Sequence, residues 1–372
     1  MHEKNRGERV LIDGSRLIIE SLARAGAHAF IGYPITPANL LYLYGSQRME
    51  LMLPAPDEIT TLQWMSGLSI TGKLPVTATS FPGFALMLES VNMAYMMELP
   101  MVIVLVQRLG PATGTATCGA QGDLLMMKGM ISGGHPVPVL ATSGFEDCWK
   151  LPAKAAEIAV KLRTPVILLT SKEEVMTQKS FDIGKLDRIS PVEWPVYTAD
   201  CAYKSYKPTG MVPDFLPVSQ EVHQVRINAS THDQSGILQH SSPEALANTR
   251  RLEEKVVSMM EDYRICELDE QEGAGTLVVA YGITASAARE AVSNLREKGK
   301  KVSLLVPGTL LPVPNAYLDY IQAYENVLIA EENMNNQLGE LLFGKTGRKG
   351  MRFVGGLGKM ITPQEIQQEA EA

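Results

Sequence analysis

Short apolar runs that alternate with helical patterns constrain the fold of this chain more than any other feature. In the first half of the chain these runs lie at residues 30–32, 76–78, 101–106, 137–141 and 166–170. Their uncharged composition, rich in β-branched residues, is typical of parallel strands that are buried on both faces. Patches with helical spacing lie between them, at residues 17–25, 86–98 and 145–161. This βαβα order predicts a doubly wound α/β sheet.

The second half of the chain repeats the pattern after an interruption. Five prolines with little periodicity between about residues 181 and 217 predict an extended linker. A charged helical stretch follows at residues 243–263, and then strands at 276–281, 301–306 and 326–331 alternate with helices at 285–298, 315–323 and 336–343. We therefore expect two α/β domains, at residues 1–190 and 266–372, joined by a linker and a connecting helix at residues 191–265.

Composition makes several classes of function improbable. The formal net charge of -7 offers no basic surface for nucleic acid. No run of 18 apolar residues predicts a membrane helix, and the charged start of the sequence does not resemble a signal peptide, so we expect a cytoplasmic protein. We expect no metal site and no iron–sulfur cluster on this chain, because its cysteines lie at least 30 residues apart: Cys118, Cys148, Cys201 and Cys266.

Polar loops follow several predicted strands, at the sheet edge where open α/β sheets bind ligands. They lie at residues 33–37, 79–84 and 107–114. The third loop contains Arg108, whose guanidinium could bind a small carboxylate through two parallel hydrogen bonds. A surface ion pair at a strand end is the alternative interpretation. Glu58 follows Asp57 at a predicted helix start, where a carboxylate usually interacts only with the helix dipole.

The common phosphate-binding motifs are missing. The glycine-rich stretches at residues 344–350 and 355–359 have neither Walker spacing nor a GxGxxG pattern after a strand. The sequence also lacks the Gly-Asp-Gly and asparagine signature with which thiamine enzymes bind pyrophosphate and magnesium. We therefore expect that another chain would complete any thiamine site.

In order and spacing, the loops resemble the α subunits of 2-oxoacid:ferredoxin oxidoreductases, the superfamily that acts on pyruvate, 2-oxoglutarate and 2-oxoisovalerate. The resemblance covers about residues 26–172 and 217–366. Its strongest pieces are Gly32-Tyr33-Pro34-Ile35-Thr36-Pro37, Ala78-Thr79-Ser80, Pro82-Gly83-Phe84, Val106-Gln107-Arg108, Ala120-Gln121-Gly122-Asp123-Leu124 and Leu277-Val278-Val279-Ala280-Tyr281-Gly282.

The resemblance implies a thiamine-diphosphate pyrimidine-binding domain followed by a transketolase-C-terminal-like domain. It implies oxidative decarboxylation of a 2-oxoacid to acyl-CoA and CO2, with electrons passed through iron–sulfur clusters to ferredoxin. It also implies a β subunit that carries magnesium, the diphosphate site and a 4Fe-4S cluster, in an α2β2 or larger assembly.

The resemblance assigns roles to particular residues. Aligned without gaps from Ala78-Thr79-Ser80, Glu58 falls on the glutamate that hydrogen-bonds N1′ of the aminopyrimidine, and it is expected to be buried, catalytic and cofactor-binding. The hydrogen bond to N1′ favours the tautomer that removes the C2 proton. Thr36 and Arg108 would bind the substrate carboxylate.

Weaker assignments follow from the same matching. Thr113 would line the substrate pocket, and Pro34 and Gln121 would contact the cofactor.

The sequence departs from the family at two points. Thr117-Cys118-Gly119 stands where 2-oxoglutarate enzymes often have a lysine or arginine, and Phe81 stands where glycine is usual. A smaller or apolar 2-oxoacid is therefore favoured, and the alternative is that Lys128 or a partner residue compensates for the missing cation. Two alternatives remain open: a non-catalytic scaffold paralogue that pairs with a thiamine-enzyme β subunit, and a thiamine enzyme that does not use ferredoxin. The retained Glu58, Thr36 and Arg108 speak against a scaffold.

Overall fold

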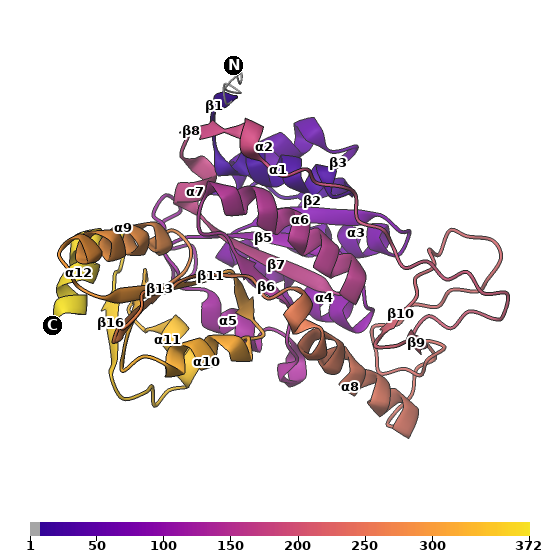
Figure 1. The fold of residues 1–372 in the computed structure, drawn as a ribbon. Helices are drawn as coiled ribbons and strands as arrows, with labels where there is room; N and C mark the ends of the chain where they lie inside the picture. Colours follow the sequence, from indigo (N-terminus) through magenta and orange to yellow (C-terminus); the bar gives the residue numbers. More distant parts are fainter. Residues whose placement is uncertain (1–7) are drawn as a thin grey trace, which may run out of the picture.

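The computed structural model describes residues 8–372 and divides them between two α/β domains (Figure 1). The first domain contains a seven-stranded sheet, in which every neighbouring pair is parallel except the pair formed by β14 and β6. In spatial order its strands are β14 (Thr309–Leu311), β6 (Val139–Ala141), β7 (Pro165–Ser171), β5 (Met101–Gln107), β4 (Leu74–Thr79), β2 (Ala27–Gly32) and β3 (Leu51–Pro54).

Helices cover both faces of this sheet, because both faces of its central strand are apolar. Met101, Ile103 and Leu105 of β5 pack in one core, whereas Val102 and Val104 pack in another. The helices α3 (Glu58–Ser69) and α4 (Phe81–Met96) contribute to the first core, and α1 (Gly14–Arg24) and α6 (Phe145–Leu162) contribute to the second. The predicted doubly wound sheet is confirmed. Shorter helices complete the domain: α2 (Asn39–Arg48), α5 (Leu124–Gly129), α7 (Lys172–Met176) and the 3₁₀ turns at Ser132–Gly134 and Ile183–Lys185.

The second domain has a five-stranded sheet that is parallel except at one edge, where β11 runs antiparallel to β13. Its strands in spatial order are β11 (Cys266–Asp269), β13 (Val302–Pro307), β12 (Thr276–Ala280), β15 (Asn326–Glu331) and β16 (Met351–Gly355). Its helices are α9 (Thr284–Glu297) and α12 (Pro363–Glu371), which pack together, and α10 (Asn315–Gln322) and α11 (Gln337–Phe343), whose apolar residues join the α3–α4 core of the first domain.

The two domains share a sheet across the predicted boundary. β14 lies in the sequence of the second domain, yet it pairs with β6 of the first domain. The sequence analysis did not predict β14 and β3, which have only three and four residues, and it also missed β16 and α12. The exact domain limits stay a prediction.

The predicted linker is an excursion of extended loops that stands out on the side of the first domain away from the second domain (Figure 1). It contains two short strands, β9 (Pro208–Thr209) and β10 (Val212–Pro213), and leads into α8 (Pro243–Ser258) and a 3₁₀ turn at Met260–Asp262. A separate two-stranded sheet joins β1 (Arg9–Ile12) to β8 (Lys179–Asp182).

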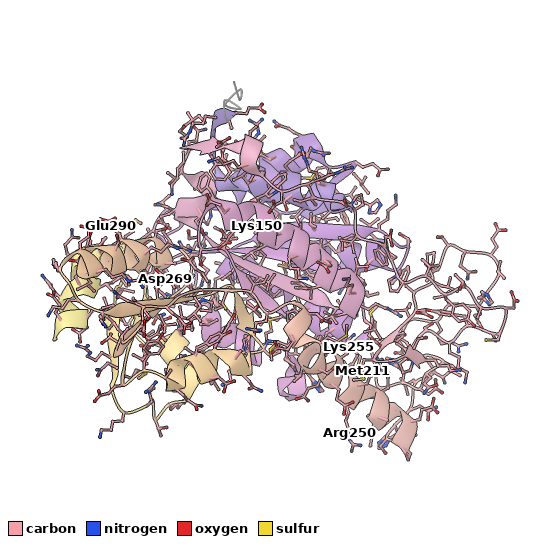
Figure 2. All side chains as sticks on the ribbon, in the orientation of Figure 1. Lys150, Met211, Arg250, Lys255, Asp269 and Glu290 are labelled. Carbon is pink, nitrogen blue, oxygen red and sulfur yellow. The ribbon has the colours of Figure 1, made fainter. Side chains whose placement is uncertain are left out.

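A buried ion cluster holds the excursion and α8 against the end of α4. Glu98 is fully buried and accepts hydrogen bonds from Lys255 Nζ at 2.7 Å and Arg251 Nη1 at 3.0 Å. Arg251 also donates to the carbonyl oxygen of Met211, and Figure 2 shows Lys255 and Met211 close together where α8 meets the body of the domain. Burial alone would raise the pKa of Glu98, but Lys255 and Arg251 outweigh it and hold that pKa well below its ordinary value.

We expect Glu98→Ala to lower the free energy of unfolding by about 3–5 kcal/mol, because it leaves two buried cations without their carboxylate. Glu157→Ala is the matched control, since Glu157 pairs with the more exposed Lys154 and Lys161, and it should cost about 1 kcal/mol or less. Urea unfolding of both variants measures the difference. Equal losses would contradict the role given to the buried cluster.

Candidate active site

Four loops of the first domain converge at one edge of its sheet. The neighbouring parallel strands β5, β4, β2 and β3 all end at this edge. Thr79 is the last residue of β4, and the segments that follow β5, β2 and β3 contain Arg108, Thr36 and Glu58. The site predicted from separate stretches of sequence is therefore assembled from adjacent strand ends.

Glu58 is the first residue of α3. Asp57 caps this helix, because its side chain accepts a hydrogen bond from the backbone N–H of Thr60 at 2.7 Å. This cap fixes where the helix begins and turns the next side chain inward, so that Glu58 is only 6% exposed. The expected burial of Glu58 is confirmed. Among residues 8–372 neither a hydrogen-bond donor nor a cation pairs with its carboxyl group.

The carboxyl group of Glu58 lies against the start of α4. A Cβ atom built on Gly83 would lie 2.5 Å from Oε1 of Glu58 and 2.3 Å from Oγ1 of Thr79. Oε1 of Glu58 and Oγ1 of Thr79 thus border the space that a side chain at position 83 would fill. Sequence analysis gave neither Thr79 nor Gly83 a role.

Arg108 joins the loop after β5 to the loop after β2. Its Nη1 donates to the carbonyl oxygen of Thr36, and its Nε is buried without a partner among the described residues. The residue is 6% exposed, so burial lowers the pKa of Arg108, while the charge of Asp123 opposes this shift. The structure therefore brings together Arg108 and Thr36, which the sequence analysis had paired. Their binding of a carboxylate stays a prediction.

Thr113 and Pro34 lie on the same edge but are exposed. Thr113 is near the tip of a loop that is closed by hydrogen bonds from the Leu109 N–H to the Cys118 carbonyl (2.8 Å) and from the Thr115 N–H to the Leu109 carbonyl (3.0 Å). Neither residue is enclosed by this chain alone. Their roles in substrate and cofactor binding stay predictions.

Gln121 lies between the domains. Its Nε2 donates to the Tyr281 carbonyl at 2.8 Å, and its Oε1 accepts from the Thr284 hydroxyl at 2.6 Å and the Glu332 N–H at 2.8 Å. Asn333 also donates to the Gln121 carbonyl at 2.9 Å. Both ends of the amide are thus used to fix the loop after β5 to the second domain. The predicted cofactor contact is untested, and this amide has no acceptor lone pair left for it.

Burial perturbs several acids in and behind this interface. It raises the pKa of four carboxyl groups to about 7: Asp123, Glu174, Glu331 and Glu332. Between their ordinary values and about pH 7, the folded chain therefore binds more protons than the unfolded chain. Stability that is present at lower pH is lost as the pH rises through this window.

We expect the free energy of unfolding to fall through this window, and the last part of the fall, between about pH 6.5 and pH 8, should be on the order of 1 kcal/mol for each of these groups. The lowered pKa values of His28 and His232 act in the opposite direction mainly below pH 6.5, and burial lowers the pKa of Lys255 to about 8, which offsets a small part of the fall near pH 8. Urea unfolding at the two pH values measures the fall, and Glu174→Gln should reduce it. Stability that is constant or higher at pH 8 would contradict the protonated state of these acids.

Comparison with known families identifies the chain. Residues 20–251 match the family described as "Pyruvate flavodoxin/ferredoxin oxidoreductase, thiamine diP-bdg". The chain belongs to this family. Residues 274–366 of this oxidoreductase subunit match "Pyruvate:ferredoxin oxidoreductase core domain II". The predicted resemblance to α subunits of 2-oxoacid:ferredoxin oxidoreductases is confirmed.

Relatives of this oxidoreductase subunit include the 2-oxoglutarate synthase subunit KorA of Methanocaldococcus jannaschii, which is 31% identical over 87% of this chain and 88% of that protein. The ketoisovalerate oxidoreductase subunit VorB of Methanothermobacter thermautotrophicus is 27% identical over 94% of this chain and 93% of that protein. The relatives of this oxidoreductase subunit are thus named for more than one 2-oxoacid substrate.

Among solved structures, the 2-oxoglutarate:ferredoxin oxidoreductase of Magnetococcus marinus, with 2-oxoglutarate, coenzyme A and succinyl-CoA bound, matches with a TM-score of 0.93 and 26% identity. The match covers 99% of this chain and 66% of that one, so this chain spans just under two thirds of the longer chain. A split-gene transketolase matches at 15% identity with a TM-score of 0.55, which supports the fold alone. No helix within residues 8–372 is both long enough and apolar enough to cross a membrane.

Proposed function

We propose that this oxidoreductase subunit binds the aminopyrimidine ring of thiamine diphosphate through Glu58. With a β subunit it then carries out the oxidative decarboxylation of a 2-oxoacid to acyl-CoA and CO2, and the electrons leave through iron–sulfur clusters to ferredoxin. The observation that carries the proposal is the carboxyl group of Glu58. Glu58 is a buried residue at the ligand-binding edge of a doubly wound sheet, and no residue of the described chain pairs with its carboxyl group.

The surroundings of Glu58 fit the cofactor. When bound, thiamine diphosphate supplies the carbanion chemistry of decarboxylation and takes up the electron pair. The carboxyl of Glu58 is free to exchange a proton with N1′ of the ring, because its oxygens are not used by any residue from 8 to 372. Within the same residues no cation pairs with it, so no ion pair competes with the ring for these oxygens.

Arg108 and Thr36 fit a substrate carboxylate. The guanidinium keeps Nε and Nη2 available, because its one hydrogen bond to the described part of the chain is made by Nη1. Its burial removes competing water and strengthens a charge-assisted pair. We infer that Arg108 holds the carboxylate while Thr36 lines the same corner.

Apolar residues that flank the site suggest that a second chain covers it. Tyr33, Ile59 and Leu86 are 42%, 49% and 54% exposed, and they neighbour Pro34, Glu58 and the start of α4. We infer that a β subunit packs here, brings the diphosphate site, magnesium and a 4Fe-4S cluster, and forms an α2β2 or larger assembly.

The loop after Arg108 bears on the choice of substrate. A Cβ on Gly119 would lie 2.4 Å from Oε2 of Glu173, so a carboxylate that is paired with Lys172 at 3.2 Å lies against the segment Thr117-Cys118-Gly119, where the resemblance would place a lysine or arginine in 2-oxoglutarate enzymes. The segment itself therefore offers no cation to a second carboxylate on the substrate. We propose that the enzyme prefers a 2-oxoacid with a short or apolar side chain over 2-oxoglutarate.

Co-expression of the chain with its β subunit tests the proposed function. The complex should bind thiamine diphosphate and reduce a viologen dye with coenzyme A and a 2-oxoacid. In a panel of pyruvate, 2-oxoisovalerate and 2-oxoglutarate, the last should give the lowest kcat/KM. A complex with intact clusters that binds no thiamine diphosphate and oxidises no 2-oxoacid would refute the function and favour a scaffold.

A further inference from the structure

Two residues that the proposed site does not use lie near the carboxyl group of Glu58. Thr79 is the last residue of β4, and Gly83 lies in the first turn of α4. A Cβ on Gly83 would meet Thr79 Oγ1 at 2.3 Å, Glu58 Oε1 at 2.5 Å and Glu58 Cγ at 2.8 Å. The hydroxyl oxygen and the carboxyl oxygen therefore border the same space beside the Cα of Gly83, although no hydrogen bond joins them in this structure.

Gly83 leaves space for the side-chain oxygens of Glu58 and Thr79. The glycines of this chain that need a left-handed backbone have positive φ angles, and Gly83 is not one of them. Gly83 lies in an ordinary helical turn, where glycine is a poor helix former, so the backbone conformation does not require a glycine there. The lack of a side chain explains the glycine, because any Cβ atom at this position would overlap the two oxygens.

Thr79 has a hydroxyl group with little else to bind. The residue is 1% exposed, and its hydroxyl donates only to the Ser80 carbonyl at 3.3 Å, which is long for an O–H···O hydrogen bond. A buried hydroxyl in such a position gains from a better acceptor, and its hydrogen can rotate toward one. The nearest unpaired acceptor beside Gly83 is Oε1 of Glu58.

We propose that Thr79 is a positioning residue for Glu58, with Gly83 as the spacer that lets the two groups meet. In the assembled site the hydroxyl turns from the Ser80 carbonyl to donate to Oε1 of the carboxyl, a bond that it does not make in the chain alone, and leaves the other oxygen for N1′ of the aminopyrimidine. This inference rests on the proposed function and adds a residue to its site. A neutral donor suits the task, because it orients the carboxyl without fixing it in the ionised state as a lysine or arginine would.

The exchange of the cofactor C2 proton for deuterium, followed in the assembled complex without substrate, tests the proposal. Thr79→Val keeps the shape of the side chain and removes its hydroxyl, so exchange should slow by about tenfold or more. Thr79→Ser restores the hydroxyl and should recover most of the rate. Thr77→Val is the matched control: it is the same change, equally buried, two residues earlier on β4, and should leave exchange unchanged.

Gly83→Ala gives a second, independent variant. The added methyl would occupy the space between the two oxygens and push the carboxyl aside, so exchange should slow at least as much as in Thr79→Val. This variant decides the question if Thr79→Val does not assemble. Exchange at the wild-type rate in the assembled Thr79→Val or Gly83→Ala complex would overturn the inference and leave the proposed function standing. A wild-type complex that binds no thiamine diphosphate would overturn both.

Discussion

Glu58→Ala in the assembled complex is expected to lower kcat by about 100- to 10,000-fold, the range typical of losing a positioned acid–base group. The physical reason is that no other described carboxyl group lies beside Gly83 to take over the proton at N1′. Viologen reduction with saturating 2-oxoacid and coenzyme A measures kcat. Size-exclusion chromatography shows whether the complex still assembles.

The neighbouring carboxylate provides the control for Glu58. Asp57→Ala removes the cap of α3 and should lower stability by about 1 kcal/mol, yet it leaves the acid–base group in place. We expect this variant to keep most of its kcat. Similar activity in the assembled Glu58→Ala and Asp57→Ala complexes would remove Glu58 from the mechanism.

Arg108→Ala is expected to lower kcat/KM for the 2-oxoacid by on the order of 100-fold or more, because it removes the buried partner of the substrate carboxylate. Arg108→Lys should recover only part of the loss, since an ammonium group cannot reproduce the planar fork of donors. The affinity for thiamine diphosphate should change little, because the assigned cofactor contact is Glu58. Steady-state kinetics and titration with the cofactor measure the two quantities.

An exposed lysine supplies the control for Arg108. Lys128 lies in the last turn of α5 and is exposed, so Lys128→Ala should leave kcat/KM near the wild-type value. Loss of cofactor affinity in Arg108→Ala with an unchanged KM for the 2-oxoacid would place Arg108 at the cofactor and contradict its assignment to the substrate.

The fold was largely predictable because strand burial leaves a clear pattern in the sequence. The run from Met101 to Val106 is apolar at every position, and the structure shows why: alternate residues enter two different cores. β14 could not be predicted in the same way. Its three residues have too short a pattern, and their place beside β6 depends on how the two domains pack.

The site was predictable in part. The local sequence around Glu58 indicated only a helix start, and its assignment to the cofactor came from the family resemblance. The structure shows that Glu58 does begin a helix and that its carboxyl points inward. The contact with Gly83 could not be read from the sequence, because it joins two segments 25 residues apart through a missing side chain.

For Gln121, the sequence motif predicted a place near the active site but could not predict the contacts that its side chain makes. Its motif marked it as a residue near the active site, but its amide binds Tyr281, Thr284 and Glu332, which lie more than 150 residues later in the chain. Through these bonds the second domain fixes the loop that also contains Arg108. The second domain therefore supports the site even though we assign no catalytic group to it.

A structure of the assembled complex with thiamine diphosphate bound is the most direct test. We expect a carboxylate oxygen of Glu58 to lie about 2.6–3.2 Å from N1′ of the aminopyrimidine, the range of a functional hydrogen bond. A ring that binds at another edge of the sheet, or a Glu58 side chain that turns into solvent when the β subunit is present, would contradict the account.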